Sequence, residues 1–215
     1  MDDLTQLFKE HHEKVFAEHG ATAKGVDWGD EQEMLFRYDK MLAVLDRDFE
    51  QPEHPTFLDV GCGWGGLLEH ARKKGIDVDY AGIDVVESMI LHARENFPGV
   101  EFIHEDIFNT DAQYDYVVCN AILTQRLTSS IPSMEAHARR LIRKMYELCR
   151  YGIAFNMMST RVNFMVQNLY YQNPMEMLAF CLTELSPKVR LDHGYSSLQS
   201  GKGKFFDFTV YIYKD

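Results

Sequence analysis

The sequence predicts an α/β fold in which a mostly parallel sheet carries helices on both faces. Three observations lead to this prediction. After Pro55, short apolar runs alternate with helical patterns, which is the order of right-handed strand–helix–strand units. Four glycines in 61-GCGWGG-66 separate the first apolar run from the first of these helices. The last two apolar runs have no helix between them, so we expect an antiparallel pair of strands at one edge.

The first 50 residues have helical patterns only. We expect a helix over residues 3–19, a loop over 21–30, and a second helix that begins at the N-cap Asp30 and carries an apolar stripe to about residue 49. The segment 51-QPEHP-55 breaks that helix. Residues 1–50 are therefore expected to form a helical lid, and residues 51–215 a cofactor-binding domain.

Seven strands are expected in the second part of the chain. Five of them are of the parallel type, and the last two form a terminal antiparallel pair across a Ser/Gly-rich loop. The expected strands are 56–60, 78–84, 101–106, 115–120, 152–157, 187–195 and 205–214, and the expected helices are 65–74, 87–96, 132–149 and 174–184.

Composition and charge narrow the class of protein. The 215 residues suffice for one domain with a sizeable core, and 46% of them are hydrophobic. The formal net charge of −11 argues against sequence-independent binding to nucleic acids. The charged start of the chain and the lack of a long apolar run predict a cytoplasmic protein with no membrane segment.

The sequence offers little sign of a metal site. The four cysteines are far apart and form no CxxC pair, which indicates reduced thiols: Cys62, Cys119, Cys149 and Cys181. Three histidines, His11, His12 and His19, fall on a charged helix that we expect to be solvated. We therefore expect no metal.

The glycine cluster predicts a ligand, because a tight turn alone needs fewer glycines. Gly61, Gly63 and Gly66 satisfy the dinucleotide pattern G-x-G-x-x-G. Asp59, two residues before Gly61, argues against a dinucleotide, since its charge would repel a pyrophosphate. A ligand with a cationic group and no phosphate suits the aspartate better. S-adenosylmethionine (SAM) is such a ligand, because its methionine part carries an ammonium group.

Acidic residues also follow the next two strands. Asp84 is placed to accept hydrogen bonds from ribose hydroxyls, which NAD and SAM both carry. Asp106 is placed to accept a bond from the adenine amino group, with Ile107 beside the ring and Met89 over its other face. Acids at the carboxyl ends of three strands of one α/β sheet converge on one crevice, where ligands bind.

These motifs resemble those of class I SAM-dependent methyltransferases. The stretches LDVGCGWGG, GIDVVESMI, HEDIF and YDYVVCNAIL carry the resemblance, which runs from about Val26 to the end of the chain. It implies a Rossmann-like fold of seven strands with a reversed last strand, and SAM as cofactor with S-adenosylhomocysteine as product. It also implies roles for the residues: Asp59, Gly61 and Gly63 at the methionine part, Asp84 at the ribose, and Asp106 and Ile107 at the adenine. Val85, next to Asp84, is also expected to bind the cofactor.

Further candidates lie where the fold brings polar side chains to the same crevice. Trp28 is expected to cover the cofactor and Arg37 to hold its carboxylate, although an arginine on such a helix is often only solvated. For Asn120, at the end of the fourth strand, three roles are open: contact with the cofactor, contact with the substrate, or a plain turn residue. It is not followed by the Pro-Pro-aromatic motif of nucleic-acid amine methyltransferases.

The chemistry itself demands few catalytic groups. A sulfonium methyl group is already activated, so the enzyme mainly aligns a nucleophile, and it needs a base only when the nucleophile arrives protonated. The candidates are Asn156, Tyr171 and His193, of which His193 is the base by residue type. Two of them have a structural alternative: Tyr171, with Tyr170, as a core residue, and His193 as a satisfied structural histidine.

The sequence thus predicts a SAM-dependent methyltransferase that acts on N, O or C of a small-molecule acceptor. One alternative is an enzyme of the same fold that cyclises SAM, as in azetidine-2-carboxylate formation, and releases methylthioadenosine. A second is a SAM-binding protein without catalysis, and an NAD-linked oxidoreductase comes last. The expected partner is a small molecule rather than nucleic acid or membrane, and a homodimer is compatible with the sequence.

Overall fold

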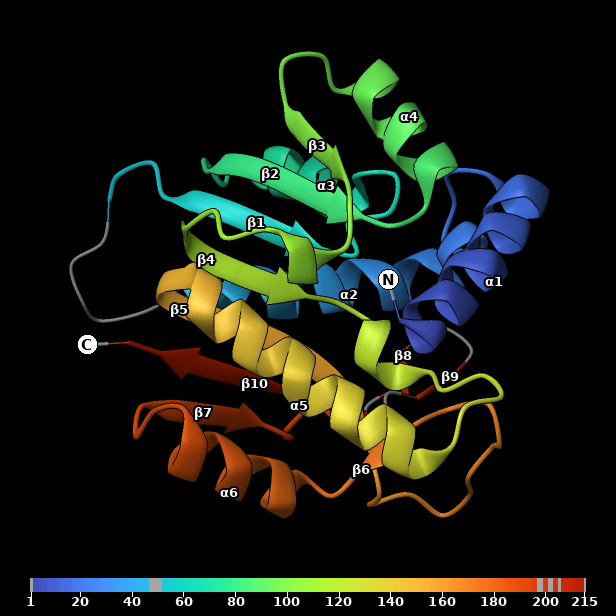
Figure 1. Ribbon diagram of the computed structural model, residues 1–215, viewed down its shortest axis with the longest axis vertical. Coiled ribbons are helices and arrows are strands. Elements are labelled where there is room, and N and C mark those ends of the chain that lie inside the picture. Colours follow the sequence, from blue (N-terminus) through green and yellow to red (C-terminus); the bar gives the residue numbers. More distant parts are fainter. Residues whose placement is uncertain (1, 47–51, 197–198, 201–202, 205, 215) are drawn as a thin grey trace.

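The computed structural model describes residues 2–46, 52–196, 199–200, 203–204 and 206–214. Its main sheet has the strand order β3-β2-β1-β4-β5-β10-β7, and the short β6 pairs with β5 outside this path (Figure 1). The strands are β1 Thr56–Val60, β2 Asp79–Asp84, β3 Glu101–His104, β4 Tyr114–Cys119, β5 Cys149–Ser159, β6 Tyr171–Gln172, β7 Val189–Asp192 and β10 Asp207–Tyr213. The residues β8 Gln199–Ser200 and β9 Gly203–Lys204 form a separate small pair.

The direction of the strands confirms the predicted fold class. β1 to β5 are parallel to one another, and β10 is antiparallel to both β5 and β7. The expected terminal pair is therefore β7 and β10, with β10 inserted between β5 and the edge strand β7. All seven residues of β10 are buried, as a strand with neighbours on both sides and helices over both faces requires.

Helices cover both faces of the sheet. Side chains alternate along the strands, so that Phe57 packs into one core with α2, α3 and α4, while Leu58 packs into the other with α5 and α6. The helices are α1 Asp3–His19, α2 Glu31–Leu42, α3 Gly66–Lys73, α4 Glu87–Asn96, α5 Ile131–Leu148 and α6 Pro174–Glu184. Four short 3₁₀ turns are η1 Lys24–Val26, η2 Ala43–Leu45, η3 Ile107–Asn109 and η4 Ile122–Thr124.

The first two helices have different places in the fold. α2 begins at the predicted N-cap Asp30, whose carboxylate accepts from the Glu33 amide, and it buries Met34, Tyr38 and Met41 in the core against the sheet. α1 instead lies at the end of the sheet toward which the arrows of β1 and β4 point (Figure 1). Within the segment expected to be a lid, α1 is thus the helix over the strand ends.

Contacts at both ends hold α1 in this position. Near its start, Asp2 pairs with Arg140 of α5 at 2.8 Å, and Phe8 packs on the ring of His137. Near its end, Phe16 packs edge-on against His92 of α4, with ring centroids 5.8 Å apart. α1 therefore spans the strand ends from one sheet face to the other. Among the described helices, none has both the length and the apolar character needed to cross a membrane.

Candidate active site

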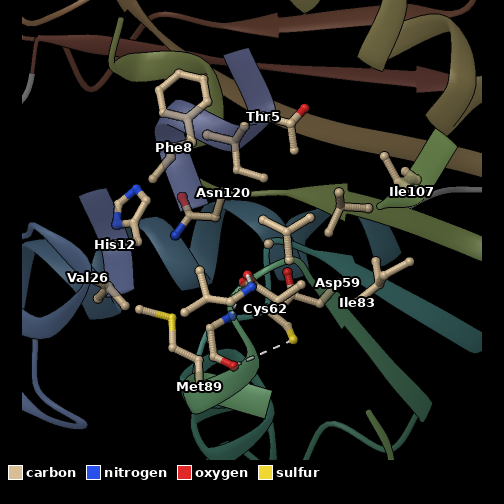
Figure 2. A pocket seen from close by; sticks show the side chains of 18 of the residues that line it. Thr5, Phe8, His12, Val26, Asp59, Cys62, Ile83, Met89, Ile107 and Asn120 are labelled. Atoms are coloured by element: carbon tan, nitrogen blue, oxygen red, sulfur yellow. Dashed lines mark hydrogen bonds between the residues drawn. The ribbon is translucent and has the colours of Figure 1, made fainter. Parts of the chain in front are cut away.

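A cavity lies at the carboxyl ends of β1, β2 and β4, below α1 (Figure 2). Ten of the residues that the sequence predicted to bind a cofactor line it together: Trp28, Asp59, Gly61, Gly63, Asp84, Val85, Met89, Asp106, Ile107 and Asn120. Phe8 and His12 reach into the same space from α1, opposite Asp59 and Met89. The site thus has a floor of strand ends and glycine turn, and a roof made by the first helix.

The glycine turn takes a shape that side chains would block. Gly61 has a φ of +70°, its amide donates to the Ile83 carbonyl at 2.8 Å, and a Cβ on it would overlap Cδ1 of Ile122. Gly63, with a φ of +53°, donates its amide to the carboxylate of Asp84 at 2.9 Å. The turn and the acidic strand end are therefore tied together, and bare backbone faces the cavity.

Asp59 is a buried carboxyl group at the floor of the cavity. Burial raises its pKa to about 7, the hydrogen bond that it accepts from the Tyr80 hydroxyl at 2.7 Å opposes this, and the charge of Asp84 adds to it. Burial also raises the pKa of Asp84, against the stabilising amides of Val86 and Gly63. A cation beside these two carboxyl groups would lower their pKa values again, because a positive charge stabilises the carboxylate form.

The charge of the cavity is one-sided. Four carboxyl groups line it, from Asp59, Asp84, Glu105 and Asp106, whereas no lysine or arginine occurs among the described residues of its wall. Asp106 is fixed by capping η3, where it accepts from the Phe108 amide at 3.2 Å. Such a cavity favours a ligand that carries positive charge.

Several lining residues were missed in the sequence. α1 contributes Thr5, Phe8 and His12, and α5 contributes His137 and Leu141. Residues 4, 8 and 12 recur at helical spacing, and this periodicity was the available signal for a buried face on α1. Burial lowers the pKa of His12 and of His137, which are therefore mainly neutral at pH 7.

The wall of the cavity carries polar atoms without partners. The Nδ1 atoms of His12 and His137 and the Oδ1 atom of Asn120 are buried and make no hydrogen bond. Buried polar groups are nearly always paired in native proteins, so these atoms are candidate contacts for a bound molecule. The Asn120 oxygen, the open glycine turn and the unbalanced acids fit a ligand with a cationic amino-acid part and a nucleoside, as SAM has.

Arg37 and Asn156 lie outside the lining of the cavity but are joined to it. Both bind Asp207 of β10: Arg37 donates from Nε at 2.8 Å, and Asn156 from Nδ2 at 3.3 Å. The guanidinium also stacks on the ring of Trp28, 4.3 Å from its centroid, and Asn156 accepts from the Ala121 amide at 2.8 Å. Since Trp28 and Ala121 line the cavity, Arg37 and Asn156 support its wall from behind.

Tyr171 and His193, the other two catalytic candidates, do not line the cavity either. The Tyr171 hydroxyl accepts from the Val166 amide at 3.2 Å, within the loop before β6. The His193 ring follows β7 and packs edge-on against Phe208, with centroids 6.1 Å apart. Tyr170, the neighbour of Tyr171, is fully buried and donates to Gln172. Among the described histidines, His12 and His137 are the ones in the cavity wall.

Comparison with known sequences gives consistent matches. Residues 57–152, which include the glycine turn and all three strand-end acids, match the family model of a methyltransferase domain. A protein of Mycobacterium tuberculosis that is named as a methyltransferase, Rv1506c, is 30% identical over 161 residues, which are 73% of this chain and 91% of that protein. The malonyl-[acyl-carrier protein] O-methyltransferase of Bacillus anthracis is 33% identical over 85 residues, 38% of this chain and 32% of its own length.

Solved structures share the fold over the whole chain. The magnesium protoporphyrin IX methyltransferase ChlM from Synechocystis PCC 6803, solved with SAM, has a TM-score of 0.69 at 14% identity, covering 100% of this chain and 99% of its own. The plantazolicin methyltransferase BpumL, solved with a triazolic desmethylPZN analogue and S-adenosylhomocysteine, has a TM-score of 0.64 at 13% identity, and the match covers 100% of both chains. At these identities the likeness is one of fold.

Proposed function

The chain belongs to the SAM-dependent methyltransferases, and from that premise we propose that it methylates a small-molecule acceptor within the cavity below α1. The observation that carries the proposal is the one-sided charge of this cavity, with four carboxyl groups and no cation from lysine or arginine among its described lining residues. SAM supplies an activated methyl group when it is bound. The residues of the chain then have to hold the two reactants and exclude water.

Within this proposal the cofactor contacts follow the order of the strands. Asp59 balances the ammonium group, and the turn at Gly61 and Gly63, which has no side chains, lets the methionine part approach the backbone closely. Asp84 accepts from the ribose hydroxyls, while Asp106 and Ile107 hold the adenine. Met89 and Val85, both in the cavity wall, support this assignment by offering apolar contact beside the nucleoside.

The proposal of a small acceptor rests on access and on charge. α1 covers the strand ends above Asp59 and is fixed at both of its ends, so that an acceptor has to fit between this helix and the strand ends. The net charge of −11 disfavours nucleic acids. Two of the structural neighbours are named for a porphyrin and for plantazolicin rather than for a nucleic acid.

The test is a titration of the purified protein with SAM by calorimetry, followed by mass spectrometry of the nucleoside after incubation with a panel of small metabolites. We expect binding without acceptor, and S-adenosylhomocysteine only in the presence of one acceptor class. Release of methylthioadenosine without any acceptor would contradict methyl transfer and indicate that the protein cyclises SAM instead. Failure to bind SAM would remove the assignment of the cavity. Sedimentation of the same sample tests whether the chain forms a homodimer, which the sequence left open.

A further inference from the structure

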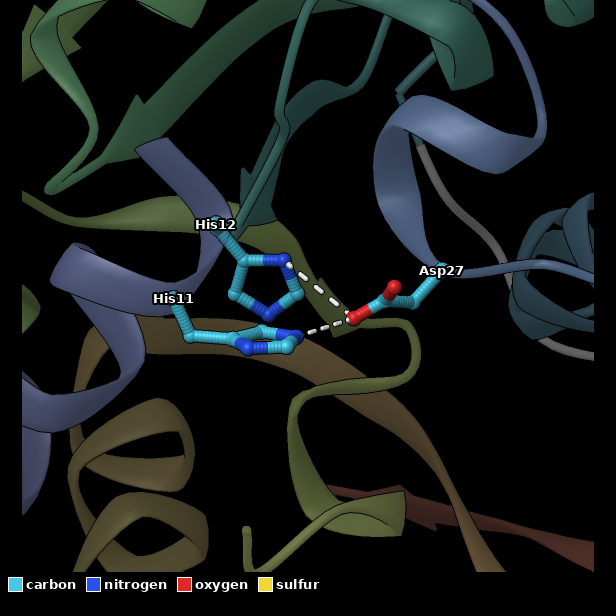
Figure 3. Close-up of side chains that lie close together, drawn as sticks. All are labelled: His11, His12 and Asp27. Carbon is cyan, nitrogen blue, oxygen red and sulfur yellow. Dashed lines mark hydrogen bonds and ion pairs between the residues drawn. The ribbon is translucent and has the colours of Figure 1, made fainter. Parts of the chain in front are cut away.

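Two neighbouring histidines of α1 converge with an aspartate from the turn after η1 (Figure 3). One ligand atom from each of His11, His12 and Asp27 lies within 4.8 Å of the other two. The Nε2 atom of His11 is 2.5 Å from Oδ2 of Asp27, and the Nδ1 atom of His12 is 4.0 Å from the same oxygen. Two imidazoles and one carboxylate thus point at one small volume.

This volume has unmet hydrogen-bonding capacity. His12 Nδ1 is buried and has no partner, although it points toward Asp27. Gln125 adds a fourth polar side chain, since its Nε2 donates to Asp27 at 3.2 Å while its Oε1 is buried and unpartnered. The His11–Asp27 hydrogen bond explains only part of the cluster, and two buried polar atoms beside it are left unsatisfied.

We propose that His11, His12 and Asp27 bind one divalent first-row transition metal ion, with the amide oxygen of Gln125 or a water as a further ligand. Imidazole and carboxylate ligands suit Zn²⁺ and its neighbours in the series better than Mg²⁺ or Ca²⁺. Zinc binds nitrogen at about 2.0–2.1 Å, so two of its ligands are at most about 4.2 Å apart. The pair His12 and Asp27 already meets this limit, and the ion would take the place of the proton between His11 and Asp27.

The ligands come from three separate parts of the chain. His11 and His12 belong to α1, Asp27 follows η1, and Gln125 follows η4 after β4. His12 and Gln125 also line the cofactor cavity. The ion would therefore join the helix above the cavity to two segments of its wall, and this reverses the expectation that the α1 histidines are only solvated. The role goes beyond methyl transfer and does not depend on it.

The experiment titrates chelator-treated full-length protein with Zn²⁺ by calorimetry and with Co²⁺ by visible absorption, without SAM. We expect one ion per chain and a Co²⁺ spectrum typical of mixed nitrogen and oxygen ligands. His11→Ala and Asp27→Ala should each weaken Zn²⁺ by at least about tenfold, since even partners that only orient a ligand contribute about 10–100-fold. His19→Ala, an exposed histidine on the same helix, is the matched control and should bind as the wild type does.

The proposal would be overturned by wild-type protein that binds neither Co²⁺ nor Zn²⁺, or by binding that His19→Ala weakens as much as His11→Ala does. Both ligand variants change side chains that are partly exposed, so loss of the fold is not expected. Thermal unfolding with and without Zn²⁺ gives an independent measure, because an ion that binds only the native chain raises its Tm. That rise should disappear in His11→Ala, and an unchanged rise would also overturn the site.

Discussion

Arg37 and Asp207 are 170 positions apart in the chain, and they form a two-pronged ion pair. The Nε atom of Arg37 donates to one carboxylate oxygen and its Nη2 atom to the other, at 2.8 Å and 3.2 Å. The side chain of Arg37 is 7% exposed and that of Asp207 is fully buried. The pair fixes α2 to β10. Trp28, which stacks on Arg37, and Ala121 after β4, which Asn156 joins to Asp207, both line the cavity and are therefore held by this pair.

Removing one member of this pair should be much costlier than removing both. Arg37→Met leaves the Asp207 carboxylate buried without its cation, which typically costs about 3–5 kcal/mol of unfolding free energy. The double variant Arg37→Met/Asp207→Leu should recover most of that loss. Urea unfolding measures both. Lys40→Met is the control, because its pair with Asp192 is partly exposed and worth at most about 1 kcal/mol.

The same variants separate two roles for Arg37. If Arg37 supports the wall, the double variant should bind SAM within a few-fold of the wild type once it is folded. A large loss of SAM affinity in a stable double variant would instead favour the sequence's expectation that Arg37 holds the cofactor carboxylate.

The raised pKa of Asp59 should make SAM binding depend on pH. With a pKa of about 7 in the free protein, the carboxylate that meets the ammonium group is a minor form at pH 6 and the major form at pH 7.5. We expect SAM affinity to rise about five- to tenfold over this range, and to stop rising near pH 8, where the ligand's own amino group loses its proton. Calorimetry at several pH values measures it, and Asp59→Asn should bind weakly with no such rise.

The stability of the free protein should respond in the opposite direction. Native Asp59 keeps its proton up to about pH 7, whereas the unfolded chain loses it near pH 4, so the native state binds more protons between these values. This group therefore lowers stability as pH rises from about 4 to 7. Asp59→Asn should raise the Tm at pH 8 more than at pH 5, by about 2–4 °C for each 1 kcal/mol. An equal or opposite change would show that Asp59 is not buried in this way.

The turn at Gly61 should not tolerate a methyl group. Gly61→Ala meets both the left-handed backbone and the side chain of Ile122, and should abolish SAM binding by displacing the turn. Gly75→Ala is the matched control: its φ of +71° gives a similar backbone cost, about 1–2 kcal/mol, but a Cβ there meets no atom within 4 Å. Calorimetry on both variants compares them. SAM affinity that falls equally in both would mean that general destabilisation, not the cavity, is responsible.

Asp84 should affect SAM and S-adenosylhomocysteine to the same extent, because both keep the ribose. Asp84→Ala removes a charged acceptor and releases the amides of Gly63 and Val86, and each such bond is worth about 1.5–3 kcal/mol. We expect both affinities to fall about 10- to 100-fold in competition titrations. Asp79→Ala, at the exposed opposite end of β2, should change neither affinity. A selective loss of one ligand would contradict the ribose assignment.

Local patterns in the sequence were enough to predict the fold and the floor of the cavity. Strand and helix periods, the N-cap at Asp30 and the glycine turn depend on near neighbours in the chain, and the structure confirms most of the elements that they predict. The second helix, expected to run to about residue 49, ends at Leu42 and continues as η2 to Leu45, while residues 47–51 lie outside the described residues. The acids at residues 59, 84 and 106 converge because the carboxyl ends of parallel strands share one edge. The position of these three residues in the cavity could therefore be predicted from the sequence alone.

What depended on distant partners was not predictable. Nothing near Arg37 indicates that an aspartate at position 207 will engage its guanidinium, and Asn156 likewise serves that distant pair. The burial of His12 and His137 follows from the crossing of α1 over the strand ends, which tertiary packing determines. His193, the base by residue type, lies against Phe208 because β10 enters the sheet beside β5.

The position of β10 has a consequence for synthesis of the chain. β7 pairs in the main sheet with β10, and β10 is made after every other strand of that sheet. While the ribosome is still adding residues 193–213, β5 presents an open edge and β7 has no described strand to join. The edge of β5 is long and apolar, and such an edge invites pairing with other chains. The nascent protein thus passes through a stage that is open to aggregation, and insertion of β10 between β5 and β7 ends it.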